Sequence, residues 1–332
     1  QKTPPQINLL RLGLYLALFP KLVMGPIVPY HELEPALAQR TIDAQDVSDG
    51  CFRFTIGLAK KALLADALAG LVTGIWGDLA SLTVLSAWLG LIGYALQLYF
   101  DFSGYSDMAI GLGRTLGFRF AENFRYPYLC SSITEFWRRW HISLGSWFKE
   151  YLYFPLGGSR TGTLRTLRNL LLVWLATGLW HGASWNYVLW GLYFGVLICL
   201  EKLLALRFRA HPRKGLLAGL YRPVCLLLAV LGWVLFRAED LPAAGRYFAC
   251  LFGGAAGASA QARLYLHDFW PVLLLGAVGA TPRCAKLAGR LGAKLQPGVR
   301  AALQAVLVLA LRACSTVWLL SGSFQSFVYF QF

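Results

Sequence analysis

Two long stretches without a formal charge constrain what this chain can fold into. Leu79–Phe100 runs for 22 residues and Asn169–Leu200 for 32 residues without Asp, Glu, Lys or Arg. A helix needs about 20 apolar residues to cross the hydrocarbon core of a bilayer. Leu79–Phe100 therefore predicts one membrane span. Asn169–Leu200 is too long for one straight helix and short for two complete spans.

Composition places the whole chain in a membrane. Charged residues make up 14% of the 332 residues, and the mean hydropathy is +0.53, whereas a soluble domain carries about 25% charged residues. The hydrophobic share of 57% excludes a disordered chain. The net charge of +15 favours cytoplasmic loops and lipid headgroups over nucleic acid in so apolar a chain. We predict an all-α, polytopic integral membrane protein that binds the lipid bilayer and no nucleic acid.

Weaker apolar segments raise the expected number of membrane-embedded helices to roughly six to nine. Neither an internal repeat nor a linker is visible, so residues 1–332 read as one domain. Residue 1 is Gln, and we expect the natural protein to begin upstream of it. The weaker candidate spans are Leu12–Tyr30, Gly215–Phe236, Leu264–Pro282 and Ala301–Phe332, with Phe52–Trp76 either spanning or lying in the interface.

The flanks of the 32-residue stretch predict a hairpin. Six basic residues from Arg138 to Arg168 precede it, and five from Lys202 to Lys214 follow it. Basic residues collect on the cytoplasmic side, so the stretch should enter and leave the membrane on that side. We expect two short helices that meet near Gly178–Ser184, beside His181.

Two histidines are candidates for chemistry. A desolvated His181 would stay neutral and could accept a proton as a general base; the alternative is a core histidine bonded to a neighbouring helix. His141 follows Trp137 and Trp140, which lie one turn apart and could wall a cavity or sit at the lipid interface. An interfacial aromatic and basic helix is the alternative there.

The other polar residues predict structure more than chemistry. Asp101 and Asp107 fall on opposite faces of an ideal helix, and we expect charge pairing with Arg114 or later arginines. The seven cysteines are scattered without metal-binding or disulfide spacing, and we expect them to be buried apolar residues. No metal site is predicted.

Several segments together resemble the membrane-bound O-acyltransferase family, and within it the bacterial alginate O-acetyltransferase branch. The most specific are FWRRWHISLGSWFKEYLYFPLGG and, after a gap, GLWHGASWNYVLWG. The resemblance covers most of the chain, including FPKLVMGPIVPYHELEP, GLAKKALLAD, YFDFSGYSDMAIGLGRTLGFRFAENFRYPY and the terminal FVYFQF.

The resemblance implies a helical bundle with re-entrant or broken helices around a central tunnel, here lacking the family's N-terminal helices. It implies that His181 is the catalytic base and that His141 is the second polar residue of the site. Further residues matching these motifs would shape the tunnel: Asp101, Tyr105, Asp107, Asn123, Trp137, Trp140 and Trp180.

The implied reaction is O-acetyl transfer without a bound cofactor. Acetyl-CoA, or another acyl thioester from the cytoplasm, would donate an acetyl group toward a hydroxyl in an alginate-type exopolysaccharide. Periplasmic acetyltransferase-type proteins and the polysaccharide synthesis machinery would be partners, in the bacterial inner membrane. A lipid O-acyltransferase, a transporter or flippase, and a non-catalytic scaffold are the alternatives.

Overall fold

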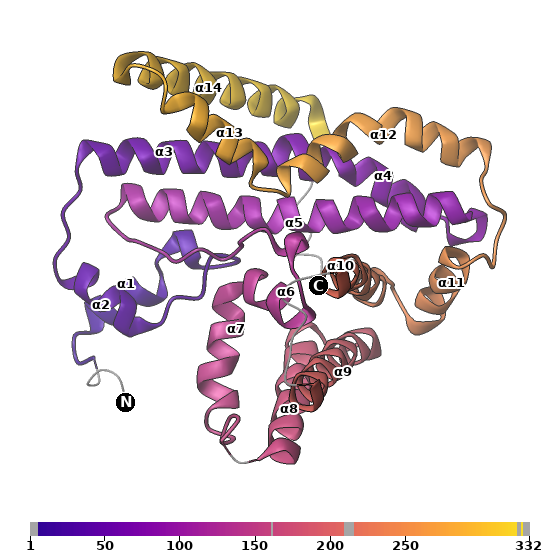
Figure 1. The fold of residues 1–332 in the computed structure, drawn as a ribbon. Helices are drawn as coiled ribbons and strands as arrows, with labels where there is room; N and C mark the ends of the chain where they lie inside the picture. The colour runs from indigo at the N-terminus through magenta and orange to yellow at the C-terminus, as the bar shows by residue number, and fades with distance from the viewer. Residues whose placement is uncertain (1–5, 161, 209–215, 324–326, 328–332) are drawn as a thin grey trace. The chain divides into compact units, whose positions relative to one another are not determined.

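In the computed structural model, residues 6–160, 162–208, 216–323 and 327 are described, and within them the regular structure is helical without strands (Figure 1). Contacts divide the chain into two compact units. Unit 1 comprises Gln1–Ala67, Leu98–Phe124 and Arg283–Gln331. Unit 2 comprises Leu68–Gln97 and Arg125–Pro282, together with Phe332.

Unit 1 is built around two closely packed helices, α3 (Ala44–Ala59) and the C-terminal part of α5 (Val84–Thr115). Two glycines on α3, Gly50 and Gly57, lie against Gly111 and Gly104 of α5. An added Cβ at Gly57 would stand 2.5 Å from the Gly104 carbonyl oxygen. Small residues let two backbones approach in this way, and the pairing order makes the helices antiparallel.

The remaining elements of unit 1 flank this pair. A π-helix, η2 (Lys60–Ala65), continues α3 into α4 (Asp66–Trp76), which belongs to unit 2 from Leu68 onward. The other elements are α1 (Leu9–Leu16), η1 (Phe19–Lys21), α2 (Tyr30–Ala38), α13 (Arg283–Gly292), α14 (Pro297–Trp318) and η6 (Leu319–Ser323).

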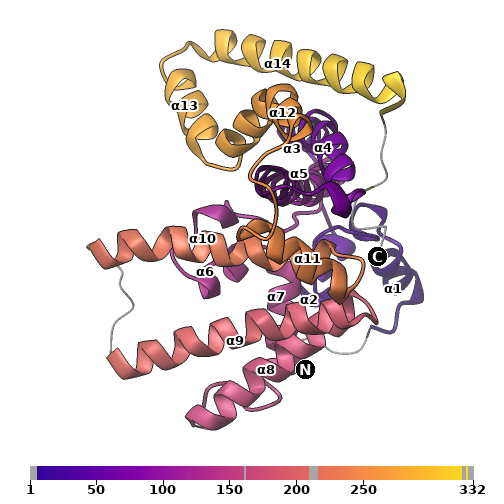
Figure 2. The same cartoon turned by 90° about the vertical axis from the view of Figure 1, so that its right-hand side faces the viewer.

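Unit 2 contains the predicted hairpin. Helices α8 (Thr163–His181) and α9 (Trp185–Phe208) lie side by side in Figures 1 and 2. The chain turns at Gly182, whose φ of 154° favours glycine, inside the predicted break. An added Cβ at Gly178 would stand 2.3 Å from the Tyr187 carbonyl oxygen, so this glycine permits the close helix contact.

Short helices and three further long ones complete unit 2. The short ones are η3 (Leu79–Ser81), η4 (Pro127–Leu129), α6 (Ile133–Arg139), α7 (Ile142–Phe148) and η5 (Lys149–Tyr153). The long ones are α10 (Leu216–Arg237), α11 (Leu241–Leu251) and α12 (Ala260–Gly279).

Within the described residues, four helices are long and apolar enough to cross a membrane, or up to five if α12 and α13 form one bent span. Val84–Thr115 confirms the span predicted from Leu79–Phe100, and Gly219–Arg237 and Pro297–Ser321 confirm two weaker ones. The other part of the terminal prediction, residues 324–326 and 328–332, lies outside the described residues, as do Arg209, Arg213 and Lys214 of the second basic cluster.

By length and composition, four or five helices in the described part of the chain can cross a membrane, and this count does not test how many shorter helices belong to the expected six to nine membrane-embedded ones. The segment Leu12–Tyr30 yields only the short α1 and η1, because Pro20, Gly25 and Pro26 interrupt it. The hairpin also differs from the two short helices that we expected. Trp185–Leu206 of α9 is long and apolar enough to cross a membrane alone, whereas α8 is not among the helices that meet this criterion.

Candidate functional site

The structure brings the two candidate histidines to one indole ring in unit 2. His181 is the last residue of α8, and His141 lies between α6 and α7. The Trp180 ring centroid is 6.3 Å from that of His141 and 4.9 Å from that of His181. Trp180 is 51% exposed and His141 only 6%. The site therefore has an open side at the indole and a closed side at His141.

The backbone at His141 is held in an unusual conformation. Its φ of 45° and ψ of 54° lie in the left-handed region, which residues other than glycine seldom adopt. Among the described non-glycine residues, Tyr126 is the other with a positive φ. Such strained positions persist where surrounding structure enforces them, and they concentrate at functional sites.

Helix α6, which leads into His141, is anchored at its N-terminus by a buried carboxylate. Ser132 caps the helix by accepting from the Glu135 N–H at 2.9 Å. Glu201 of α9 accepts from the N–H groups of Ile133 at 2.6 Å and Thr134 at 2.8 Å. The Thr134 hydroxyl, at 2.6 Å, and the Tyr221 hydroxyl, at 2.8 Å, also donate to Glu201. These bonds satisfy donors that a helix start leaves open.

Aromatic rings enclose His181 on the protein side. The Trp190 ring, 1% exposed, stands edge-to-face to His181 at 5.0 Å, and the Phe236 ring lies at 5.1 Å. Trp137 packs against Trp190 at 5.5 Å. The indole N–H groups of Trp137 and Trp190 are buried and find no acceptor among the described residues. Buried donors normally have partners, so this cluster has capacity for a ligand oxygen.

Loss of hydration favours the neutral form of both imidazoles, of which His141 is buried and His181 partly buried. His141 and His181 lie outside the helices that qualify as spans. Loss of hydration lowers the pKa of each imidazole to about 3, and at His141 the neighbouring His181 contributes to the lowering. A neutral imidazole has one nitrogen that accepts and one that donates a hydrogen bond. The pair can thus both take a proton and donate to an oxygen.

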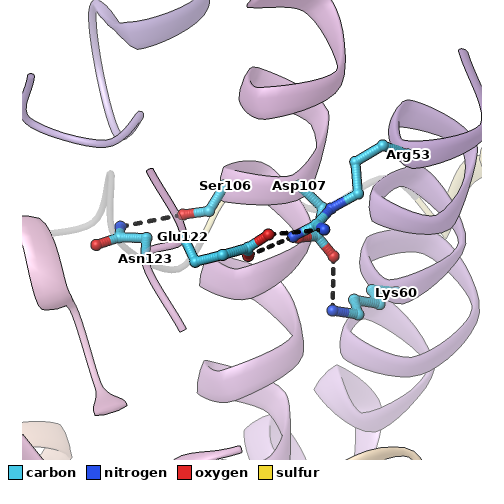
Figure 3. A network of polar contacts seen from close by, with 6 residues as sticks. All are labelled: Arg53, Lys60, Ser106, Asp107, Glu122 and Asn123. Atoms are coloured by element: carbon cyan, nitrogen blue, oxygen red, sulfur yellow. Dashed lines mark hydrogen bonds and ion pairs between the residues drawn. The ribbon is translucent and has the colours of Figure 1, made fainter. Parts of the chain in front are cut away.

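Four of the predicted site residues, Asp101, Tyr105, Asp107 and Asn123, belong to unit 1. Arg53 donates to Asp107 at 2.9 and 2.6 Å and bridges it to Glu122 (Figure 3). Lys60 donates to the second Asp107 oxygen at 2.6 Å. The same view shows Asn123 donating to the Ser106 hydroxyl, at 3.1 Å.

The aspartates are paired, but not with the arginine we expected. Asp101 lies 2.8 Å from the ammonium of Lys61, and both side chains are buried. Arg114 instead contacts Asp46 at 3.1 Å and Asp49 at 2.7 Å. The expectation failed because the partners come from α3 and η2, which pack against α5. Tyr105 contacts Phe327 edge-on at 5.0 Å. That these residues line a tunnel stays a prediction.

Trp137, Trp140 and Trp180 all belong to the unit that holds the histidines. Trp140 is buried against Trp233, with ring centroids 4.8 Å apart. Trp137 reaches the site through Trp190, whereas the Trp180 ring lies beside both histidines.

Sequence reasoning missed four residues around this site: Trp190, Phe236, Glu201 and Arg237. A signal existed for Glu201, which is the only acidic residue between Glu150 and Glu239. Trp190 lies within the segment GLWHGASWNYVLWG, and no pattern singled out Phe236 or Arg237.

The expectation that the cysteines are buried is wrong for Cys284 and Cys314, which are exposed. Cys130, Cys199 and Cys225 are buried as expected. None of the seven forms a disulfide. In the described part of the chain, no group of three or more His, Cys, Asp or Glu side chains is placed to hold a metal ion.

Comparison with known proteins identifies the family. The model of the membrane-bound O-acyltransferase family matches residues 3–230. The probable alginate O-acetylase AlgI of Pseudomonas fluorescens is 47% identical over 254 residues, which are 75% of this chain and 50% of the relative. The peptidoglycan O-acetyltransferase of Helicobacter pylori is 39% identical over 239 residues, 70% of this chain and 44% of that protein.

A more distant relative is the teichoic acid D-alanyltransferase of Bacillus subtilis, 29% identical over 208 residues, 58% of this chain and 51% of that protein. The chain thus spans about half the length of the curated relatives it matches. With a family match over residues 3–230 and helices able to cross a bilayer, this multi-pass membrane chain belongs to the membrane-bound O-acyltransferase family.

Proposed function

We propose that this protein is an O-acyltransferase that moves an acetyl group from a cytoplasmic thioester toward a hydroxyl in a secreted polysaccharide pathway. The observation that carries the proposal is the convergence of His141 and His181 on Trp180. His141 is 40 positions from His181 in the sequence, and loss of hydration favours the neutral form of both imidazoles. The relatives are named as an alginate O-acetylase, a peptidoglycan O-acetyltransferase and a teichoic acid D-alanyltransferase, which supports the reaction class.

The site residues fit this chemistry. His181 takes the proton of the acceptor hydroxyl as its oxygen attacks the thioester carbonyl carbon. The negative charge that develops on the carbonyl oxygen needs a donor, which we assign to His141. The carbon–sulfur bond then breaks, and the imidazolium returns the proton to the departing thiolate. The products are an O-acetyl ester and a free thiol, so atoms and charge balance.

The aromatic cluster supplies the environment for these steps. By excluding water on the side of Trp190 and Phe236, it strengthens each electrostatic contact. The buried indole N–H groups of Trp137 and Trp190 have no acceptor in the described residues, so a carbonyl oxygen in this cluster would satisfy a donor that is otherwise unpaired. The acyl donor that we propose is acetyl-CoA, which acts as a substrate. The proposed steps use no resident cofactor.

The acceptor side of the proposal concerns location and partners. Relatives are named for alginate, peptidoglycan and teichoic acid, polymers that have in common their hydroxyl or ester-bearing sites outside the cytoplasm. We assign the protein to the bacterial inner membrane, where a cytoplasmic thioester and an external polymer are both within reach. Alginate-type exopolysaccharide is the proposed polymer, reached with periplasmic acetyltransferase-type partners.

The decisive experiment supplies radiolabelled acetyl-CoA to bacterial membranes in which the protein and its polymer-synthesis partners are expressed. Label in polymer, protein and lipid is counted separately for wild type, His181→Ala and the control His267→Ala. His267 is 83% exposed in its side chain and lies in α12. A histidine base contributes about 10²–10⁴-fold, so the first variant should lose that much transfer and the control none.

Each pattern of label decides between functions. Label in polymer or a partner protein that falls in His181→Ala supports the proposal. Label concentrated in the lipid extract would instead make the protein a lipid O-acyltransferase. Equal label in wild type and His181→Ala, at equal expression, would refute the catalytic role of His181. Polymer export that changes without any transfer of label would favour a transporter or a scaffold.

A further inference from the structure

Arg237, the last residue of α10, carries a charge that no acidic side chain neutralises. All 16 Asp and Glu residues of the chain lie in its described parts. Among those residues, none forms an ion pair or hydrogen bond with the Arg237 guanidinium, although Glu239 and Asp240 follow closely in sequence. An arginine has five N–H donors and cannot lose its proton. The half-buried guanidinium therefore keeps N–H donors that can bind an acceptor from outside the described residues.

The neighbours of Arg237 are aromatic and do not supply such an acceptor. Its guanidinium carbon lies 5.8 Å from the Trp76 ring centroid and 5.9 Å from that of Tyr94. Both distances are near the outer limit of a cation–π contact, about 6 Å. The Trp76 indole donates to the Gly90 carbonyl, and the Tyr247 hydroxyl donates to the Ala87 carbonyl. The Arg237 guanidinium thus faces the Trp76 ring, whose indole N–H is already bonded to a backbone carbonyl, and the Tyr94 ring.

Arg237 lies next to the aromatic rings that surround His181. Phe236, the preceding residue, has its ring 5.1 Å from His181 and 5.3 Å from Tyr187. The guanidinium also interacts electrostatically with the phenols of Tyr187 and Tyr247. All of these residues belong to unit 2. An anionic group held by Arg237 would therefore lie beside the ring cluster around His181.

We propose that Arg237 binds an oxyanion, a phosphate or a carboxylate, of a substrate whose reacting group lies at His181. The inference rests on the proposed O-acyl transfer and adds an anionic subsite to it. A guanidinium matches the planar pair of oxygens in these groups and binds them through two parallel hydrogen bonds. Acetyl-CoA has phosphates, and an acidic polysaccharide has carboxylates, so both substrates offer the required chemistry.

The test compares Arg237→Gln and Arg237→Lys with Arg222→Gln in native membranes. Arg222 is an exposed arginine of the same helix, 15 positions and about four turns away. KM and kcat are measured for acetyl-CoA, for S-acetyl-pantetheine, which lacks phosphates, and for the acceptor. Hydrogen bonds to charged groups contribute about 1.5–3 kcal/mol, so Arg237→Gln should raise one KM by about 10- to 100-fold, with partial rescue in Arg237→Lys.

The substrate whose KM rises identifies the bound oxyanion. A rise for acetyl-CoA that is absent for S-acetyl-pantetheine assigns the subsite to donor phosphate, and a rise for the acceptor alone assigns it to a carboxylate. Unchanged KM values for all three substrates would overturn the proposal. So would a KM effect that disappears when anionic lipids are removed, because Arg237 would then bind a headgroup.

Binding without turnover separates this proposal from the proposed function. S-ethyl-CoA has a thioether in place of the thioester, and so it binds without transferring an acyl group. Its dissociation constant is measured with His181→Ala and with His181→Ala carrying Arg237→Gln. If Arg237 holds donor phosphate, the second protein binds the analogue at least about 10-fold more weakly. This outcome stands even if His181 is not the base.

Discussion

Replacing Glu201 by alanine should destabilise the protein through the start of α6. In the native structure, one carboxylate, 4% exposed, accepts four hydrogen bonds from Ile133, Thr134 and Tyr221. A buried donor left unpaired costs about 1–3 kcal/mol. The Ile133 residue is 1% exposed, so water cannot replace the carboxylate at its N–H. Allowing for hydration of the more accessible Thr134 and Tyr221 groups, the expected loss is about 3–5 kcal/mol.

Unfolding of the purified protein in detergent, followed by near-ultraviolet circular dichroism against denaturant, measures this loss. Glu239→Ala is the matched control, since Glu239 is exposed and should change the free energy of unfolding by less than about 0.5 kcal/mol. Glu201→Gln retains one acceptor oxygen and should lie between wild type and Glu201→Ala. A loss below about 1 kcal/mol in Glu201→Ala would refute the idea that these bonds hold α6, and with it our account of the strain at His141.

Two further predictions concern helix packing and pH, and they accompany those for His181 and Arg237 above. Gly178→Ala should lower the free energy of unfolding by about 1–3 kcal/mol in the same assay, because its methyl group would stand 2.3 Å from the Tyr187 carbonyl oxygen. The control Gly245→Ala has open space around the added methyl group and should be neutral or slightly stabilising. Equal effects of the two substitutions would contradict the packing argument. Burial lowers the pKa of His141 from 6.5 to about 3, so below pH 6.5 the unfolded chain binds a proton at this residue that the folded protein does not. The contribution of His141 to stability is therefore constant above pH 6.5 and falls below it by up to about 1.4 kcal/mol per pH unit, and His181 adds a similar slope. His141→Gln should reduce the total slope by one proton, and an unchanged slope would show that His141 is not buried as a neutral imidazole.

Local properties of the chain follow directly from its amino-acid sequence. The charge-free run at Leu79–Phe100 predicts a span, which the structure places in α5, because apolar length decides whether a helix can cross a bilayer. The break between α8 and α9 is predicted to within a few residues, since Gly182 removes the Cβ that would oppose its turn. The short helices within Leu12–Tyr30 have the same local origin, because proline and glycine interrupt that apolar segment.

What the amino-acid sequence determined by itself is therefore the membrane class and the helical architecture, and it singled out two histidines that the structure places beside one tryptophan ring. It did not determine the partners of the charges. Asp107 pairs with Arg53 and Lys60, Glu201 holds a helix far from it in sequence, and Arg237 keeps its charge beside the His181 cluster without an acidic partner in the described chain. These ion pairs and hydrogen bonds join residues on different packed helices. The register of such helices depends on glycine contacts such as that of Gly57 with Gly104. Hydropathy reports the burial of each segment alone, so the placement of polar groups across helices was decided only by the tertiary structure.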